Sequence, residues 1–372
     1  MREVHAIVED LSLKLGTSGE KWLQSATKKP KYFEFTPVEL YAITERMKLA
    51  EPTTNGTFPI HDVLCSDGKT DVANYVEFLH NVRNLKVRGA RGYVGTSNII
   101  WNSLPFGLNL CKNITALWIS DFDVRMIHDL YSVRNTCKRV VIHYSMKKLS
   151  VKPNEMLPFE NQEKWSSLEE VDFSFNELEE IDESISLLSL VRKMNLSHNL
   201  LRGIGDHLQH LTMLTELNVS HNAIEDLDLW YMKLGNVKRL YLVGNKISAL
   251  NGLHKLYSLE FLDLTDNVIA SPDDIRAAGI LPCLDHLILR GNPIRQVIEY
   301  RIKVLEHFGE RAIEVKLDSR KPDQREVDTV AVRLALRKAR EEKEEQTRKK
   351  ALGIDERTKL NLKFFLLLGK FF

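Results

Sequence analysis

Residues 214–224 read Leu-Thr-Glu-Leu-Asn-Val-Ser-His-Asn-Ala-Ile, and this arrangement of apolar and polar positions recurs five more times in the chain. Each copy follows apolar-xx-apolar-x-apolar-xx-Asn-x-apolar. The copies begin at Leu168, Val191, Leu214, Val237, Leu259 and Leu284. Their asparagines are Asn176, Asn199, Asn222, Asn245, Asn267 and Asn292, at successive intervals of 23, 23, 23, 22 and 25 residues. Six matches in one register indicate a structural repeat.

Each copy predicts a short strand followed by a turn. Because side chains alternate between the faces of a strand, Leu217 and Val219 point together into a core. The asparagine amide can satisfy backbone groups that the turn leaves unpaired. This pattern is typical of leucine-rich repeats. We therefore expect an α/β repeat solenoid, an arc with short parallel strands on its concave face, short or 3₁₀ convex segments, and the six asparagines in a stacked amide ladder.

Three weaker copies precede the six regular ones. They begin at Val82, Ile114 and Cys137 and place Ala90, Phe122 and Ser145 where the regular copies have asparagine. The first two begin 32 residues apart, and the third begins 31 residues before Leu168. We therefore expect loops near residues 92–108 and 150–165.

The flanking segments are expected to close the solenoid, because terminal repeats would otherwise expose core. Apolar spacing predicts a helix around residues 300–308 that ends at Gly309, over the open end of the last repeat. The domains expected are a helical N-terminal segment (1–50), a loop linker (51–77), degenerate repeats (78–165), six regular repeats (166–294), a C-terminal cap (295–320), a charged helix (325–352) and a tail (353–372).

Composition narrows the function. The 372 residues include 52 Lys and Arg against 51 Asp and Glu, a net charge of +1, so a general nucleic-acid-binding surface is not expected. No signal peptide or apolar stretch of membrane-spanning length occurs, which favours a cytoplasmic protein. The cysteines match no metal-binding spacing and are expected as free thiols. They are Cys65, Cys111, Cys137 and Cys283.

Catalytic signatures are weak. Residues 16–21, Gly-Thr-Ser-Gly-Glu-Lys, fail the spacing of a phosphate-binding loop, and neither HExxH nor GxSxG occurs. Asp206, His207 and His210 lie in the variable part of a repeat. His198 and His221 each precede a ladder asparagine and are explained as repeat positions. We expect no enzyme activity, no cofactor and no metal site.

The concave face is the expected place for a protein partner. Its residues alternate with the core positions, and in the last three repeats they are aromatic or cationic, the types that anchor interfaces. The expected partner-binding residues are Arg239, Tyr241, Phe261, His286, Ile288 and Arg290. An alternative is that the cap or a neighbouring loop covers these side chains.

Several segments outside the repeat pattern carry a more specific signal. They include Pro-Val-Glu-Leu-Tyr-Ala-Ile-Thr-Glu at 37–45, Gly-Leu-His-Lys-Leu-Tyr-Ser-Leu at 252–259 and Tyr-Arg-Ile-Lys-Val-Leu-Glu-His-Phe-Gly-Glu-Arg-Ala at 300–312. Shorter ones lie at 95–99, 181–185, 233–240, 281–284 and 327–330. From about Pro37 to Lys338 the chain resembles the nischarin family of cytoplasmic and endosomal leucine-rich-repeat proteins.

The resemblance implies an intracellular scaffold that binds integrin cytoplasmic tails, the GTPase Rac and its effector kinases, restrains cell migration and acts in endosomal traffic. Members of that family begin with a phosphoinositide-binding PX domain, for which this sequence has no room, so phosphoinositide binding is not expected. They also continue into acidic and proline-rich regions that this sequence lacks. A second function stays open, that of a regulatory subunit holding a catalytic partner such as a protein phosphatase.

Overall fold

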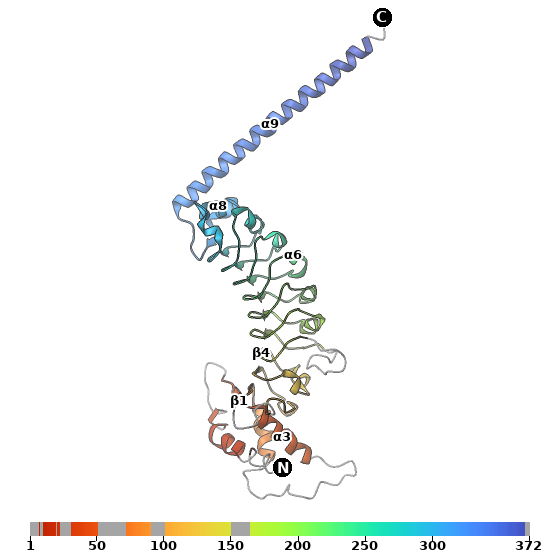
Figure 1. The fold of residues 1–372 in the computed structure, drawn as a ribbon, viewed down its shortest axis with the longest axis vertical. Coiled ribbons are helices and arrows are strands. Elements are labelled where there is room, and N and C mark those ends of the chain that lie inside the picture. The colour runs from red at the N-terminus through yellow and green to blue at the C-terminus, as the bar shows by residue number, and fades with distance from the viewer. Residues whose placement is uncertain are drawn as a thin grey trace.

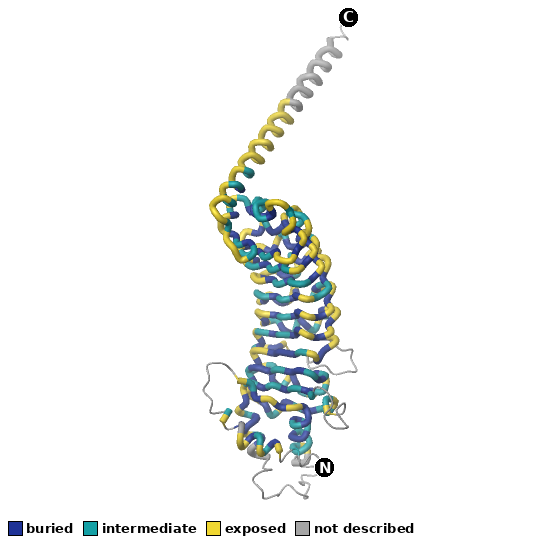
Figure 2. The backbone as a smooth tube through the Cα atoms, turned by 60° about the vertical axis from the view of Figure 1, so that its left-hand side comes forward, coloured by how far each residue is buried: buried dark blue, intermediate teal, exposed yellow. Residues whose placement is uncertain are grey.

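The computed structural model describes residues 10–19, 31–50, 72–90, 101–149 and 164–368, together with Ile7, Lys21 and Trp22. For residues 18, 49–50, 72–74 and 351–368 it describes the backbone only. Figure 1 shows an elongated, curved stack of repeats, from whose C-terminal end one long helix projects. Figure 2 shows buried residues forming a continuous core along the inside of this stack.

One parallel sheet runs through the described part of the chain, and its eleven strands lie side by side in chain order. Each strand aligns its core residue with that of the next, as Leu217 does with Met194 and Leu240. This confirms the expected solenoid. The strands are β1 (Phe33–Phe35), β2 (Asn84–Arg88), β3 (Ala116–Ser120), β4 (Arg139–His143), β5 (Glu170–Asp172), β6 (Lys193–Asn195), β7 (Glu216–Asn218), β8 (Arg239–Tyr241), β9 (Phe261–Asp263), β10 (His286–Ile288) and β11 (Lys316–Leu317).

The convex side consists of short helical segments of three to six residues each, because a repeat of about 23 residues leaves few residues for the return path. Close packing of these turns makes one glycine necessary: a Cβ on Gly252 would lie 1.6 Å from the carbonyl oxygen of Leu227. The convex segments are η2 (Val124–Met126), η3 (Leu130–Val133), η4 (Glu183–Leu188), η5 (His207–His210), α6 (Trp230–Lys233), η6 (Asn251–Leu253), η7 (Pro272–Ile275) and α7 (Arg276–Gly279).

The N-terminal end differs from expectation in two places. The segment expected to be helical contains η1 (Leu15–Gly19) and α3 (Pro37–Ala50), but also β1, whose Phe33 and Phe35 are buried in the core beside β2. The segment expected as a loop up to residue 77 contains the start of α4 (Val72–Asn81). Its aromatic residues pack inward, as Tyr75 and Phe78 do, and this burial stabilises the helix. Residues 51–71 lie outside the described residues, as do 91–100 and 150–163, which hold most of both expected loops.

The repeat asparagines connect neighbouring turns. Asn245 Nδ2 donates to the carbonyl oxygen of Leu242 in its own turn, at 3.0 Å, and to that of Val219 in the preceding repeat, at 3.1 Å. Its Oδ1 accepts from the backbone N–H of Ile224, also at 3.1 Å. The same pair of connections, to its own turn and to the preceding repeat, recurs at Asn176, Asn199, Asn222, Asn267 and Asn292.

The C-terminal end is more elaborate than expected. The helix around residue 300 is short, α8 (Tyr300–Glu306), and it is followed by η9 (Gly309–Ile313) and by β11, which adds a strand to the sheet beyond β10. The short segment η8 (Pro293–Gln296) lies between β10 and α8. The expected helix and tail form one continuous helix, α9 (Gln324–Leu368), because strong helix formers such as Ala, Leu, Glu, Lys and Arg dominate this segment.

The first turns of α9 are attached to α8. Arg301 Nε donates to Glu326 Oε1 at 2.6 Å, and both side chains are less than one-fifth exposed. Arg333 pairs with Glu306 at 3.0 Å, and Val330 is buried at 2% exposure. Residues 335–350 of α9 are exposed, and Figure 1 shows the helix projecting away from the stack of repeats.

Replacing Asn245 with leucine tests the ladder. Asn245→Leu leaves the turn groups of two repeats unpaired in a buried place, so we expect a loss of about 1–3 kcal/mol in the free energy of unfolding. Urea denaturation measures this, with Asn251→Leu, at an exposed position, as the control. An Asn245→Leu chain as stable as the control would contradict the role of the amide.

Deleting residues 295–372 tests the C-terminal cap. The deletion uncovers Leu287 and Leu289, which are fully buried, so we expect aggregation. A chain ending at Arg340 keeps α8, β11 and the packed part of α9 and is expected to stay monomeric with an unchanged Tm. Light scattering after size exclusion separates the two. A monomeric short chain with the parent's Tm would show that the end needs no cover.

Candidate functional site

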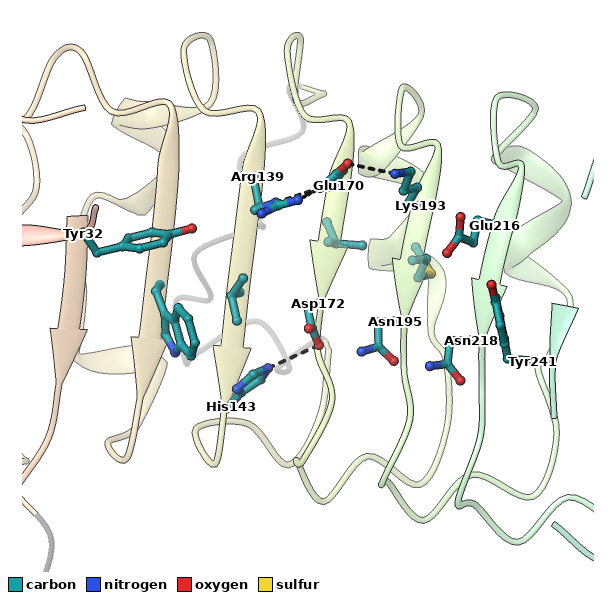
Figure 3. Close-up of a pocket in the computed structure, with 14 residues that line it drawn as sticks. Tyr32, Arg139, His143, Glu170, Asp172, Lys193, Asn195, Glu216, Asn218 and Tyr241 are labelled. Carbon is teal, nitrogen blue, oxygen red and sulfur yellow. Dashed lines mark hydrogen bonds and ion pairs between the residues drawn. The ribbon is translucent and has the colours of Figure 1, made fainter. Parts of the chain in front are cut away.

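The concave face holds a hollow of about 440 Å³ that crosses the middle of the sheet from β3 to β8. We call it the central groove. Figure 3 shows its polar side chains rising from successive strands in two rows, because equivalent repeat positions align in register. Its lining includes Tyr32, Trp118, Arg139, Val141, His143, Glu170, Asp172, Lys193, Asn195, Glu216, Asn218 and Tyr241.

The first row alternates in charge across five strands. Its members within the groove are Arg139, Glu170, Lys193 and Glu216, and Arg239 continues the row beyond the groove. Arg139 Nε donates to Glu170 Oε2 at 2.7 Å, and Lys193 Nζ lies 3.3 Å from Glu170 Oε1. Burial raises the pKa of Glu170, but these two cations outweigh it and hold the pKa below its usual value. Glu216 makes no ion pair with the described residues, so its carboxylate is available to a partner's cation.

The second row is made of carboxylate and amide groups. Asn195 Oδ1 and Asn218 Oδ1 accept from the backbone N–H groups of Ser197 and Ser220, at 3.1 and 3.0 Å. These bonds hold each side chain in place and use its oxygen. No described residue accepts a hydrogen bond from either amide nitrogen, so both nitrogens keep their donors for a partner that lies in the groove.

Asp172, in the same row, is held by its neighbours. Its Oδ1 accepts from the hydroxyl of Ser174 at 2.6 Å and lies 3.2 Å from His143 Nε2. Burial raises the pKa of Asp172, but the hydrogen bonds from His143 and Ser174 together lower it below the usual value. Asp172 is therefore an ionised, oriented acceptor at neutral pH.

Aromatic side chains border the groove toward β1. The rings of Tyr32 and Trp118 meet edge-on with centroids 5.7 Å apart, and Trp118 meets His143 at the same centroid distance. Lys86 Nζ lies 5.2 Å from the Trp118 ring centroid, which is cation–π range. The expected partner-binding residues did not include these, because Tyr32 precedes any visible repeat and Trp118 and His143 lie in degenerate ones.

The six expected partner-binding residues share one face but divide into two groups. Tyr241 and Phe261 have ring centroids 5.0 Å apart, and the Arg239 guanidinium lies 6.0 Å from the Phe261 ring. The other group adjoins the cap, because β11 places Lys316 Nζ 2.9 Å from His286 Nε2, and Arg290 donates to the carbonyl of Asp318 at 2.8 Å. Ile288, on the same strand as His286, is half-buried. Tyr241 is the member of the expected set that also lines the central groove.

Other candidate chemistry has local explanations. Asp206 forms an ion pair with Lys233 at 3.0 Å, beside His207 and His210 on η5. Burial raises the pKa of Cys111 and Cys137 to about 12, so neither thiol is a nucleophile at neutral pH. Cys283 is exposed, and Cys65 lies outside the described residues.

The described residues contain neither a cluster of metal ligands nor a helix suited to span a membrane. Within the described ranges, no three His, Cys, Asp or Glu side chains gather as a metal site requires. Among the helices of the same ranges, none has the length and apolar character that crossing a bilayer needs.

The repeats, the parallel sheet and the register together define a leucine-rich-repeat solenoid, and a family model for the leucine-rich repeat matches residues 166–224. The chain is similar to serine/threonine-protein kinase 11-interacting proteins, with 28% identity over 158 residues in Homo sapiens, 30% over 149 in Gallus gallus and 42% over 148 in Mus musculus. Each match covers 40% of this chain and 14% of the relative, so the similarity extends over only a small part of each relative's length. An internalin structure from Listeria monocytogenes is 19% identical, with a TM-score of 0.38 over 60% of this chain and 65% of the internalin.

The acid side of the stability profile tests the Asp172 network. Because Asp172 has a lower pKa folded than unfolded, its ionised form stabilises the fold above about pH 4, and this is lost as pH falls through the folded-state pKa. Ser174→Ala removes one donor and raises that pKa toward its usual value. We therefore expect the variant to lose stability at about pH 7 but little at about pH 3. Urea denaturation at both values, with the exposed Ser248→Ala as control, measures it; an equal loss at both would refute the assignment.

Proposed function

We propose that this chain is a protein-binding scaffold that holds a signalling protein in its central groove. The observation that carries the proposal is the unsatisfied polar centre of the groove, where the Glu216 carboxylate and the amide nitrogens of Asn195 and Asn218 lie on rigid strands. Aromatic side chains stand at both ends, Trp118 toward β1 and Tyr241 toward β9. Interfaces combine such aromatic anchors with polar groups that a partner must match.

A protein kinase is the first partner we propose. The relatives named above are called interacting proteins of serine/threonine-protein kinase 11, and their likeness to this chain supports a kinase among its partners. The resemblance to the nischarin family, which rests on short sequence segments, supports Rac, its effector kinases and integrin tails as further candidates. With them come a cytoplasmic or endosomal location and a role in restraining cell migration.

The test uses purified partners and matched variants. Serine/threonine-protein kinase 11, Rac, an integrin tail peptide and a protein phosphatase catalytic subunit are each titrated against the chain by calorimetry. We expect the kinase to bind, and Glu216→Lys combined with Tyr241→Ala to weaken binding by about 30-fold or more, since anchor residues contribute about 2 kcal/mol or more. The control combines Glu179→Lys with Tyr257→Ala, the same changes at exposed positions that do not line the groove.

The result separates the candidates. Tight binding by the phosphatase subunit alone would replace the scaffold with a regulatory subunit. Equal affinity of the groove variant and its control, with both folded by circular dichroism, would remove the central groove as the binding site.

A further inference from the structure

The residue before each ladder position has a left-handed backbone. Such a conformation suits glycine and is enriched in Asn, Asp and His, but it is unfavourable for bulky side chains such as Tyr and Phe. Several repeats follow this preference, with Gly244, Asp266 and Gly291 at φ values of 64°, 55° and 72°. Four consecutive repeats carry a ring there instead: Tyr144, Phe175, His198 and His221 have φ values of 53°, 55°, 54° and 53°, and of these Tyr and Phe are the unfavourable types.

These four side chains form a continuous stack, which we call the ring row. The centroids of Phe175 and His198 are 4.3 Å apart with an interplanar angle of 9°, and those of His198 and His221 are 4.3 Å apart at 17°. Tyr144 lies 5.7 Å from Phe175 at the other end. The row stops at Gly244, where a Cβ would lie 2.5 Å from His221 Nδ1.

The fold does not require these rings. Tyr144 is 56% exposed and Phe175 39%, and both histidines are exposed, so the row adds little to the core. Glycine at the same position in neighbouring repeats provides the turn without strain. An unfavourable backbone conformation, as at Tyr144 and Phe175, clusters at functional sites in folded proteins.

The way the rings stack decides what they can bind. Face-to-face stacking uses the ring faces and leaves the edges toward solvent, and the edge of an aromatic ring is its positive side. The imidazole N–H groups of His198 and His221 add hydrogen-bond donors to this edge. When both rings are protonated, they also add two positive charges. Because the rings of His198 and His221 are nearly parallel, their nitrogen lone pairs point in similar directions and do not converge on one metal ion. A row of carboxylates is the complementary ligand.

We propose that the ring row binds an acidic segment of a partner protein, and that protonation of His198 and His221 strengthens this binding. None of the four residues of the ring row lines the central groove, although His143, which contacts Phe175, does. The proposal therefore stands or falls independently of the kinase-binding proposal.

The surroundings of the ring row favour pH-dependent binding. Burial, and then the charge of His221, lower the pKa of His198, so in the free protein this ring is neutral near pH 7. The titratable groups at the borders of the row are Asp121, at the equivalent position one repeat before Tyr144, the pair of His143 and Asp172 beside Phe175, and Asp266, one repeat beyond Gly244. A bound carboxylate favours the protonated rings, so binding takes up protons and strengthens as pH falls.

The test uses a fluorescent hexaglutamate peptide and the full chain, with anisotropy measured at about pH 7.5 and about pH 5.5, on either side of the usual histidine pKa of about 6.5. Glutamate stays ionised at both values. We expect binding to tighten by about tenfold or more at the lower pH, which is one pKa unit of coupling. His198→Gly with His221→Gly should abolish this gain without lowering the Tm, because glycine suits the left-handed position.

The controls make either result decisive. His128→Gln with His210→Gln removes two exposed histidines elsewhere and should keep the gain, and hexaglutamine should not bind the parent. Histidine NMR titrations provide a readout without variants: added hexaglutamate should raise the pKa of His198. An unchanged gain in the glycine variant, the same gain with hexaglutamine, or histidine titrations that hexaglutamate leaves unmoved would overturn the proposal.

Discussion

The asparagine amide that bridges each repeat to the preceding one is the interaction on which the rest of this structure depends. Where a strand ends, the chain leaves the sheet and turns, and its backbone groups lose their ladder partners in a buried place. At Asn245 one side chain supplies bonds to the turn and to the repeat before it. These bonds fix the position of each repeat relative to the preceding one, and so they keep the strands of the sheet in register.

Register in turn creates the concave surface. Because equivalent positions align, single residues that mean little in one repeat become rows across several strands, such as the alternating charges from Arg139 to Arg239. The same alignment brings Phe175, His198 and His221 into contact at the turns. One repeat pattern therefore produces two surfaces: the central groove on the strands, and the ring row at the turns where the strands end.

The ends of the solenoid follow a different rule, because there the repeat has a neighbour on one side only. Toward the N-terminus, β1 and the packed faces of α3 and α4 close the core. Toward the C-terminus, β11 and α8 do so, and the half-buried ion pair of Arg301 and Glu326 attaches α9 to them. Neither β1 nor β11 has the repeat pattern, and both form because an exposed sheet edge and core are available for pairing.

The sequence by itself determined the solenoid, the six regular repeats and the positions of their asparagines, because these follow from a local period that any one repeat displays. It also predicted partner binding on the concave face, where Tyr241 lines the central groove. Only the tertiary structure decided that Trp118 and His143 belong to that groove, that Lys316 engages His286, and that His198 and His221 stack. Each of these contacts joins residues at least 23 positions apart, so it depends on register and side-chain direction, which a period cannot specify.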